Sequence, residues 1–267
     1  MSILSFLQKG STILSNRMEQ SQISYEGRLL TENSPFGMME AYRSMRTAIL
    51  YSGNSEKSRV IGLVSSVPSE GKSLTCANLA ISFAMDGKKV LIIDADIRQA
   101  AQNAIFTLDP VNGLTEYLAG LASTPSVQQT SYPSLSVIST GKKAPNPAEL
   151  LGNGRIKQLI NEKRKEFDFI FIDFPPIELL ADALLLSDFL DGYIMVVRSG
   201  HTREALLKDA VEKIESVRGK ILGFALNDTK SKLAGTGFYG YHRKYGKYGK
   251  YGSYGGYGGY GGYGNRK

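Results

Sequence analysis

The chain has 267 residues, of which 42% are hydrophobic and 21% charged, and its formal net charge is +7. These values are ordinary for a globular protein, and the length suffices for one large domain with terminal segments in addition. A single cysteine excludes an internal disulfide framework and favours a reducing cytoplasm. With two histidines besides that cysteine, a dedicated zinc site is not expected. The sequence shows neither a transmembrane helix pattern nor a signal peptide pattern, so we expect a cytoplasmic protein.

The positive charge is concentrated near the C-terminus. Residues 238–267 contain six basic residues and no acidic ones, and subtracting these six from +7 leaves +1 for the rest of the chain. A nucleic-acid-binding face requires basic charge on the folded part of a protein. We therefore expect no nucleic-acid partner.

Residues 1–33 are polar and irregular and are expected to form a loosely held arm. Ser34 and Pro35 suit an N-cap and a first helical position, and they predict a helix that ends before Gly53. Buried strands are then predicted at 60–65, 89–94, 135–140, 167–173, 193–198 and 221–227. Helices are predicted between them at 72–85, 155–166, 178–189 and 202–217. Continuous apolar strands that alternate with helices predict an α/β fold, a mostly parallel sheet with helices on both faces.

A phosphate-binding loop is predicted at residues 66–73, Ser-Val-Pro-Ser-Glu-Gly-Lys-Ser, where serine replaces the usual first glycine. Small residues let successive backbone N–H groups surround phosphates, and the loop opens a helix whose N-terminus favours anions. A chance Gly-Lys-Ser at a helix start is the alternative, but the strand, turn and helix context favours a site for ATP and Mg²⁺. The expected loop contacts are Pro68, Ser69, Glu70, Gly71, Lys72, Ser73 and Leu74.

Two further predicted strands end in carboxylates. Residues 91–93 lead into Asp94 and Asp96, and residues 170–172 lead into Asp173. A strand-end aspartate alone is often a helix cap or a turn residue. Beside a phosphate loop, however, such carboxylates are suited to hold a magnesium ion or its waters.

Together the three elements resemble the Walker A, A′ and B motifs of the bacterial tyrosine kinases that control capsular and exopolysaccharide synthesis. In that family an apolar triplet precedes Asp-x-Asp-x-Arg and another precedes Asp-x-Pro-Pro, and both patterns occur here at 91–98 and 170–176. The resemblance extends from residue 35 to the C-terminus and implies a P-loop NTPase fold. It divides the chain into an arm (1–33), a P-loop kinase domain (34–237) and a flexible tail (238–267).

The resemblance also implies roles for the site residues. Lys72 would bind phosphates, Ser73 would ligate magnesium, and Asp173 would hold the metal through water. Asp94 and Asp96 would lie near the γ-phosphate and the metal, one of them acting as the base toward a tyrosine hydroxyl, and we favour Asp94 as that base.

Two more residues have roles that the resemblance implies. Arg98 is expected either to steady the phosphate side or to form a structural ion pair, and Asn227 is expected to contact the nucleotide base. Gln99 and Ala100 stand where the family often has Lys-Pro, so local loop contacts there differ.

An interface motif is predicted on the first helix. Glu40, Arg43 and Arg46 spell Glu-x-x-Arg-x-x-Arg, a spacing that places them on one flank of a helix. Alone this spacing suits a solvated ion pair, whereas in the resembled family it mediates a homo-oligomeric ring, possibly an octamer. The resemblance further implies a transmembrane activator or adaptor protein, a cognate tyrosine phosphatase, and a position at the inner face of the membrane through that adaptor.

The C-terminal segment is rich in tyrosine and glycine, which favours a flexible chain. Stacking on single-stranded nucleic acid and a merely sticky low-complexity end are alternatives, but an ATP site on the same chain favours a phosphoacceptor cluster. The expected acceptors are Tyr239, Tyr241, Tyr245, Tyr248, Tyr251, Tyr254, Tyr257, Tyr260 and Tyr263.

The predicted function is that of an ATP- and Mg²⁺-dependent protein-tyrosine kinase that autophosphorylates this cluster in trans and regulates capsule or exopolysaccharide biosynthesis and export. The alternative is a positioning ATPase of the ParA/MinD type without kinase activity. Such ATPases carry a signature lysine five residues before the loop lysine, where this chain has Val67. They also lack a tyrosine-rich tail.

Overall fold

The structure is a computed structural model that describes residue 25 and residues 27–52, 58–109, 111–142, 147–178 and 181–228. Most of the predicted arm and the whole tyrosine-rich tail lie outside the described residues.

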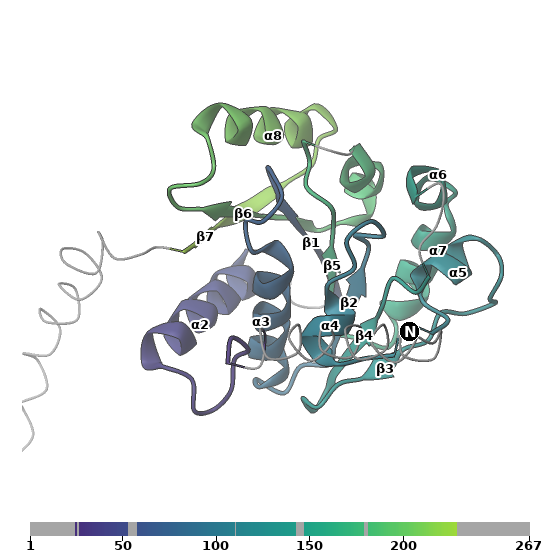
Figure 1. Cartoon of the computed structure of the whole chain (residues 1–267), viewed down its shortest axis with the longest axis horizontal. Helices are drawn as coiled ribbons and strands as arrows, with labels where there is room; N and C mark the ends of the chain where they lie inside the picture. The colour runs from purple at the N-terminus through teal and green to yellow at the C-terminus, as the bar shows by residue number, and fades with distance from the viewer. Residues whose placement is uncertain are drawn as a thin grey trace, which may run out of the picture. The chain divides into compact units, whose positions relative to one another are not determined.

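The described strands form one sheet in the order β3-β4-β2-β5-β1-β6-β7 (Figure 1). Their bounds are β1 Arg59–Ser65, β2 Val90–Asp94, β3 Gln128–Gln129, β4 Leu135–Ile138, β5 Phe169–Asp173, β6 Gly192–Arg198 and β7 Ile221–Asn227. Every pairing is parallel except that of the short β3 with β4. The predicted mostly parallel α/β sheet is confirmed, and it brings the carboxyl ends of β1, β2 and β5 to one edge.

Helices cover both faces of this sheet. Their bounds are α2 Phe36–Tyr51, α3 Lys72–Ala84, α4 Gln102–Phe106, α5 Leu114–Leu118, α6 Pro147–Gly152, α7 Arg155–Lys163, the 3₁₀ helix η1 Ala181–Phe189 and α8 Glu204–Ser216. The predicted helix at 178–189 is therefore a 3₁₀ helix that begins later. The first helix begins one residue after Pro35, and Ser34 is not its cap, because its Oγ accepts the N–H of Thr31 instead.

Two apolar cores result, one on each face. Helices α2, α3 and α4 pack on the face that carries Ile61 and Phe171, where the ring of Phe83 meets that of Phe169 at 4.3 Å. Helices α5 to α8 and η1 pack on the face that carries Ile93 and Ile172. Figure 1 shows α2 and α8 on opposite sides of β6 and β7. Because β1, β2, β4 and β5 are buried on both faces, their apolar runs are continuous rather than alternating, whereas the edge strands β3 and β7 are partly exposed.

The described end of the N-terminal segment packs firmly against α3. Leu30 is 2% exposed and belongs to the core beneath α2 and α3. Its N–H donates to Asn78 Oδ1 at 2.7 Å, and Asn78 Nδ2 donates to the carbonyl of Arg28 at 2.9 Å. This part of the expected loose arm is thus held in place, because a buried side chain in α3 satisfies its backbone groups.

Among the helices in the described ranges, none is long and apolar enough to cross a membrane.

Candidate nucleotide-binding site

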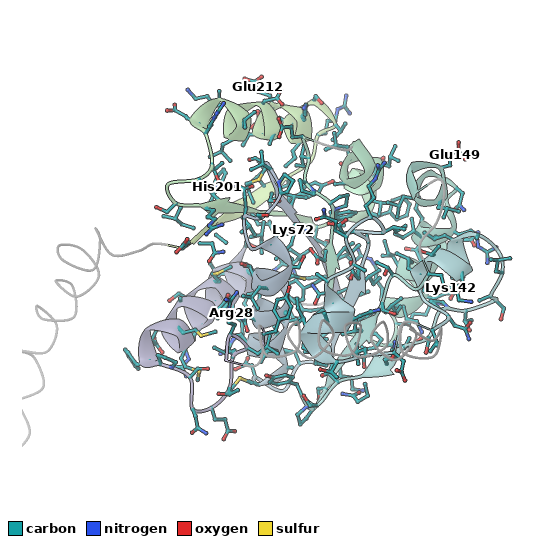
Figure 2. All side chains as sticks on the ribbon, viewed as in Figure 1. Arg28, Lys72, Lys142, Glu149, His201 and Glu212 are labelled. Atoms are coloured by element: carbon teal, nitrogen blue, oxygen red, sulfur yellow. The ribbon has the colours of Figure 1, made fainter. Side chains whose placement is uncertain are left out.

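A cleft of about 410 Å³ lies at the carboxyl ends of β1, β2 and β5. Its lining comprises residues 68–74 of the predicted phosphate loop, Ser65, Asp96, Gln99, Ala101, Ile105, Pro176, and, from the N-terminal segment, Tyr25 and Arg28. Ligands of open parallel sheets bind at this edge. Figure 2 shows Lys72 where the loop enters α3, with Arg28 on the α2 and α3 side of the sheet. We call this space the nucleotide cleft.

The phosphate loop has the backbone that its glycine requires. Gly71 has φ +84° immediately before α3, a conformation that side chains other than glycine rarely adopt. A Cβ atom there would lie 2.0 Å from Asn227 Nδ2, which itself donates to the carbonyl of Glu70 at 2.9 Å. Asn227, predicted to contact the base, therefore also holds the loop.

The carboxylate of Glu70 points into the protein and stabilises the loop from behind. One oxygen accepts the N–H of Val67 at 3.0 Å, and the other accepts the hydroxyl of Thr202. Arg198 also donates to the carbonyl of Ser69 at 3.2 Å. The sequence prediction missed Thr202 and Arg198, because they lie about 130 residues from the loop and carry no local motif.

Lys72 lies within a group of carboxylates. It is 5% exposed, its Nζ bonds the carboxylate of Asp173, and it lies 3.7 Å from Asp96 Oδ2 and 3.3 Å from Ser73 Oγ. Burial lowers the pKa of Lys72, but the negative charges of Asp173 and then of Asp96 have the larger combined effect, so the pKa of Lys72 is raised. The lysine is therefore a fully charged cation at the start of α3, as phosphate binding requires.

Asp94 is fully buried and pairs with Asp173 across the sheet register. Its carboxylate accepts the backbone N–H groups of Gln102 at 3.0 Å, of Ala101 at 3.2 Å and of Asp96 at 3.2 Å. Burial, followed by the neighbouring charge of Asp173, raises the pKa of Asp94 to about 8. Asp96 lines the nucleotide cleft and Asp94 does not, so the geometry favours Asp96 as the carboxylate that faces a ligand.

Gln102 connects these groups and was missed by the sequence prediction. Its Nε2 donates to Asp173 Oδ2 at 2.8 Å and to the carbonyl of Ser73 at 3.1 Å, while its backbone N–H binds Asp94. It begins the five-residue helix α4, which is too short to give a periodic signal in the sequence.

The donor set suits a hard divalent cation. Ser73, Asp96 and Asp173 offer oxygen ligands, and all three lie beside Lys72. Within the described ranges, no three acidic, histidine or cysteine side chains converge to hold a metal by themselves. A magnesium ion here would take its remaining ligands from phosphate and water, as is usual for this ion.

The remaining predicted residues are placed as follows. Arg98 is exposed and forms no ion pair with the described residues, so its interpretation as a structural ion pair has no support here. Glu40 and Arg43 form an exposed pair at 2.6 Å on α2. Arg46 instead turns inward, donates to the carbonyl of Ser82 and pairs with Asp86 at 3.0 Å. One member of the predicted interface motif therefore links α2 to α3 and its C-terminal turn.

Such a loop and such strand-end carboxylates on a parallel sheet define a P-loop nucleotide-binding protein. Consistent with this class, a family model described as an AAA domain matches residues 58–221. The septum site-determining protein MinD from Pyrococcus horikoshii, solved with Mg-ADP, superposes with a TM-score of 0.55 at 26% identity, over 65% of this chain and 71% of that one.

More similar proteins identify the family. The tyrosine-protein kinase YwqD of Bacillus subtilis is 38% identical over 203 residues, which cover 75% of this chain and 86% of YwqD. The crystal structure of the chimerical protein CapA2B2 gives a TM-score of 0.69 at 32% identity, over 78% of this chain and 89% of that one. The chain belongs to the bacterial tyrosine kinases.

Proposed function

We propose that the chain is an ATP- and Mg²⁺-dependent protein-tyrosine kinase that phosphorylates the C-terminal tyrosines of a second copy. The observation that carries this proposal is the phosphate loop whose Lys72 is surrounded by Asp96 and Asp173 at the ends of neighbouring strands. Family membership supports it, as do the nine tyrosines in residues 238–267.

In this proposal the loop N–H groups and Lys72 bind the β- and γ-phosphates, and Ser73 and Asp173 hold the metal. Magnesium supplies neutralisation of charge on the phosphate oxygens. The tyrosine oxygen forms a bond to the γ-phosphorus, the bond to the β–γ bridging oxygen breaks, and ADP leaves. The phenol proton passes to Asp96, which lines the cleft, or to Asp94 behind it. Positioning and charge neutralisation contribute more than full deprotonation, because the transition state is loose.

The test uses the full chain with labelled ATP and magnesium. Label on tyrosine is expected, and it should disappear in Lys72→Met and in a chain truncated before Phe238. Lys208→Met is the matched control, because Lys208 is 69% exposed and, within the part of the chain that the structure describes, its one ion pair is with its helical neighbour Glu204. Persistent tail labelling in Lys72→Met would contradict the proposal.

The same assay tests the positioning ATPase as the alternative function. Rapid phosphate release with no label on the protein would support it, whereas Val67 in place of the signature lysine argues against it.

The proposal extends to assembly and regulation. A ring of copies would bring one tail to a neighbour's site, and a transmembrane adaptor would link the ring to the membrane and to capsule or exopolysaccharide synthesis. Nine phosphates of about −1.5 each would change the +6 tail to roughly −8 and would disfavour the ring by repulsion. Light scattering should find a large oligomer before phosphorylation and a monomer after it, and equal masses would exclude this mechanism.

A further inference from the structure

A second cleft, of about 380 Å³, adjoins the nucleotide cleft. Tyr25 and Ile105 line both spaces, so the two clefts share a wall. Ile105 belongs to α4, whose first residue Gln102 binds Asp94 at the end of β2, whereas Asn227 ends β7 at the opposite edge of the sheet. The second cleft therefore adjoins the nucleotide cleft on the β2 side, which carries Asp96.

The walls of the second cleft are built into the fold. On one side, the N-terminal segment is held to α3 by the two hydrogen bonds of Asn78. On the other side, Phe106 of α4 packs edge-to-face against Tyr132, with ring centroids 6.2 Å apart. Since both walls are fixed by buried contacts, the space is preformed, as ligand sites usually are.

The lining of the second cleft suits a neutral aromatic ring. Besides the shared residues, the described lining consists of Leu29, Phe106, Tyr132, Ala104 and small hydroxyl side chains, and among the residues that the structure describes it includes no charged side chain. A phenol ring can pack against these apolar faces while its hydroxyl meets threonine or serine. A phosphotyrosine would bring about two negative charges to a surface without a cation, so it would be disfavoured.

The spacing of the tail tyrosines supplies a matching ligand. From Tyr245 to Tyr263 a tyrosine recurs every third residue, separated by Gly, Lys and Ser. A polyproline II chain has three residues per turn and rises about 3.1 Å per residue, so such tyrosines would lie on one side about 9 Å apart. Two successive tyrosines of this spacing therefore suit two clefts that share a wall.

We propose that the second cleft binds one unphosphorylated tyrosine of a partner copy's tail while the tyrosine three residues away enters the nucleotide cleft. This inference rests on the proposed kinase function and makes acceptor recognition dependent on the Tyr-x-x-Tyr spacing. It also limits the reaction, because each phosphate added removes a ligand for the second cleft.

The test compares peptides of the sequence 243–253, in which Tyr248 is the sole acceptor. One peptide carries Tyr245→Phe and Tyr251→Phe, and another carries Ala at both positions. In a third peptide each Phe changes places with the adjacent residue on the side away from Tyr248. The composition is then unchanged, and each Phe lies four residues from Tyr248 instead of three. Two peptides at a time are mixed with the full-length protein and compete for phosphorylation. The protein's own tail then competes equally with both peptides. Labelling ratios then report relative kcat/KM directly.

The Phe peptide should be preferred about tenfold over the Ala peptide, and the spacing-four peptide should behave like the Ala peptide. Ser131→Trp places a large side chain in the second cleft from an exposed position. It should reduce the ratio of kcat/KM for the Phe peptide to that for the Ala peptide to about one. Ser123→Trp is the matched control at an exposed serine outside the cleft, and it should keep the preference. Thermal unfolding of both variants checks that they fold alike.

Transfer to all peptides at equal rates would overturn this inference and leave the kinase function intact. A preference that survives in Ser131→Trp would also overturn it, because the recognition would then lie elsewhere. No transfer to any peptide or to the tail would overturn the kinase proposal, and the inference with it.

Discussion

Removal of the Asn78 side chain should destabilise the fold and the acceptor side of the site together. Asn78 is 1% exposed in α3 and bonds the N–H of Leu30 at 2.7 Å and the carbonyl of Arg28 at 2.9 Å. Asn78→Ala deletes both bonds, together with a longer contact of Nδ2 with the Tyr42 hydroxyl at 3.4 Å, and leaves the N–H of buried Leu30 without its acceptor. The lost bond to Arg28 costs about 1 kcal/mol and the unpaired N–H of Leu30 about 1–3 kcal/mol, so we expect a loss of about 2–4 kcal/mol.

Thermal unfolding followed by circular dichroism measures this loss. A domain of this size changes its Tm by about 2–4 °C per kcal/mol, so the Tm should fall by about 4–16 °C. Phosphorylation of the Phe peptide should fall as well, because Tyr25 would no longer be held in the wall of the second cleft. Asn161→Ala, at an exposed position of α7, is the matched control and should change neither quantity.

Two results would refute this reasoning in different ways. If Asn78→Ala unfolds within 1 °C of Asn161→Ala, the two hydrogen bonds contribute no net stability. If stability falls while peptide phosphorylation is unchanged, the N-terminal segment is a structural element only.

Three further predictions follow from the site. Burial raises the pKa of Asp94 to about 8, so without metal the change in Tm caused by Asp94→Asn should be more favourable near pH 7 than near pH 3, where Asp94 is protonated in both the folded and the unfolded state. Gly71→Ala combines a strained φ with a Cβ 2.0 Å from Asn227 Nδ2, so titration calorimetry should find nucleotide affinity reduced about tenfold or more. Arg46 joins α2 to α3, so Arg46→Ala should lower the free energy of unfolding by about 1–3 kcal/mol, as measured by thermal unfolding. Arg43 forms an exposed pair, so Arg43→Ala should leave stability unchanged and should change only the mass of the oligomer.

The predicted site residues that the structure brings together at one edge of the sheet are those encoded by contiguous residues. The phosphate loop is an eight-residue segment between a strand and a helix, and Asp94 and Asp173 directly end apolar runs. Parallel pairing then brings these ends together, so local patterns were sufficient. The contacts that the sequence could not predict join residues far apart, such as Thr202 with Glu70 and Gln102 with Asp173.

Short elements account for most of the remaining differences. Helices α4 and α5 have five residues each, less than two turns, so no apolar periodicity marks them. The N-terminal segment looked irregular because its anchor is one buried leucine and two backbone hydrogen bonds, not a repeated pattern. Helix α4 and the N-terminal segment line the second cleft, which explains why the sequence patterns indicated the nucleotide cleft but not the second cleft.

The hydrogen bonds of Gln102 connect the two clefts. Its side chain binds Asp173 and the carbonyl of Ser73, both at the phosphate loop, while its backbone begins α4, which forms a wall of the second cleft. Helix α4 has few backbone hydrogen bonds of its own, so its position depends strongly on these contacts. Any shift of Asp173 toward a bound metal must therefore be accommodated by Gln102 or passed on to Phe106. The nucleotide cleft and the second cleft are in this way parts of one connected structure, and a change at one cleft has a direct physical route to the other.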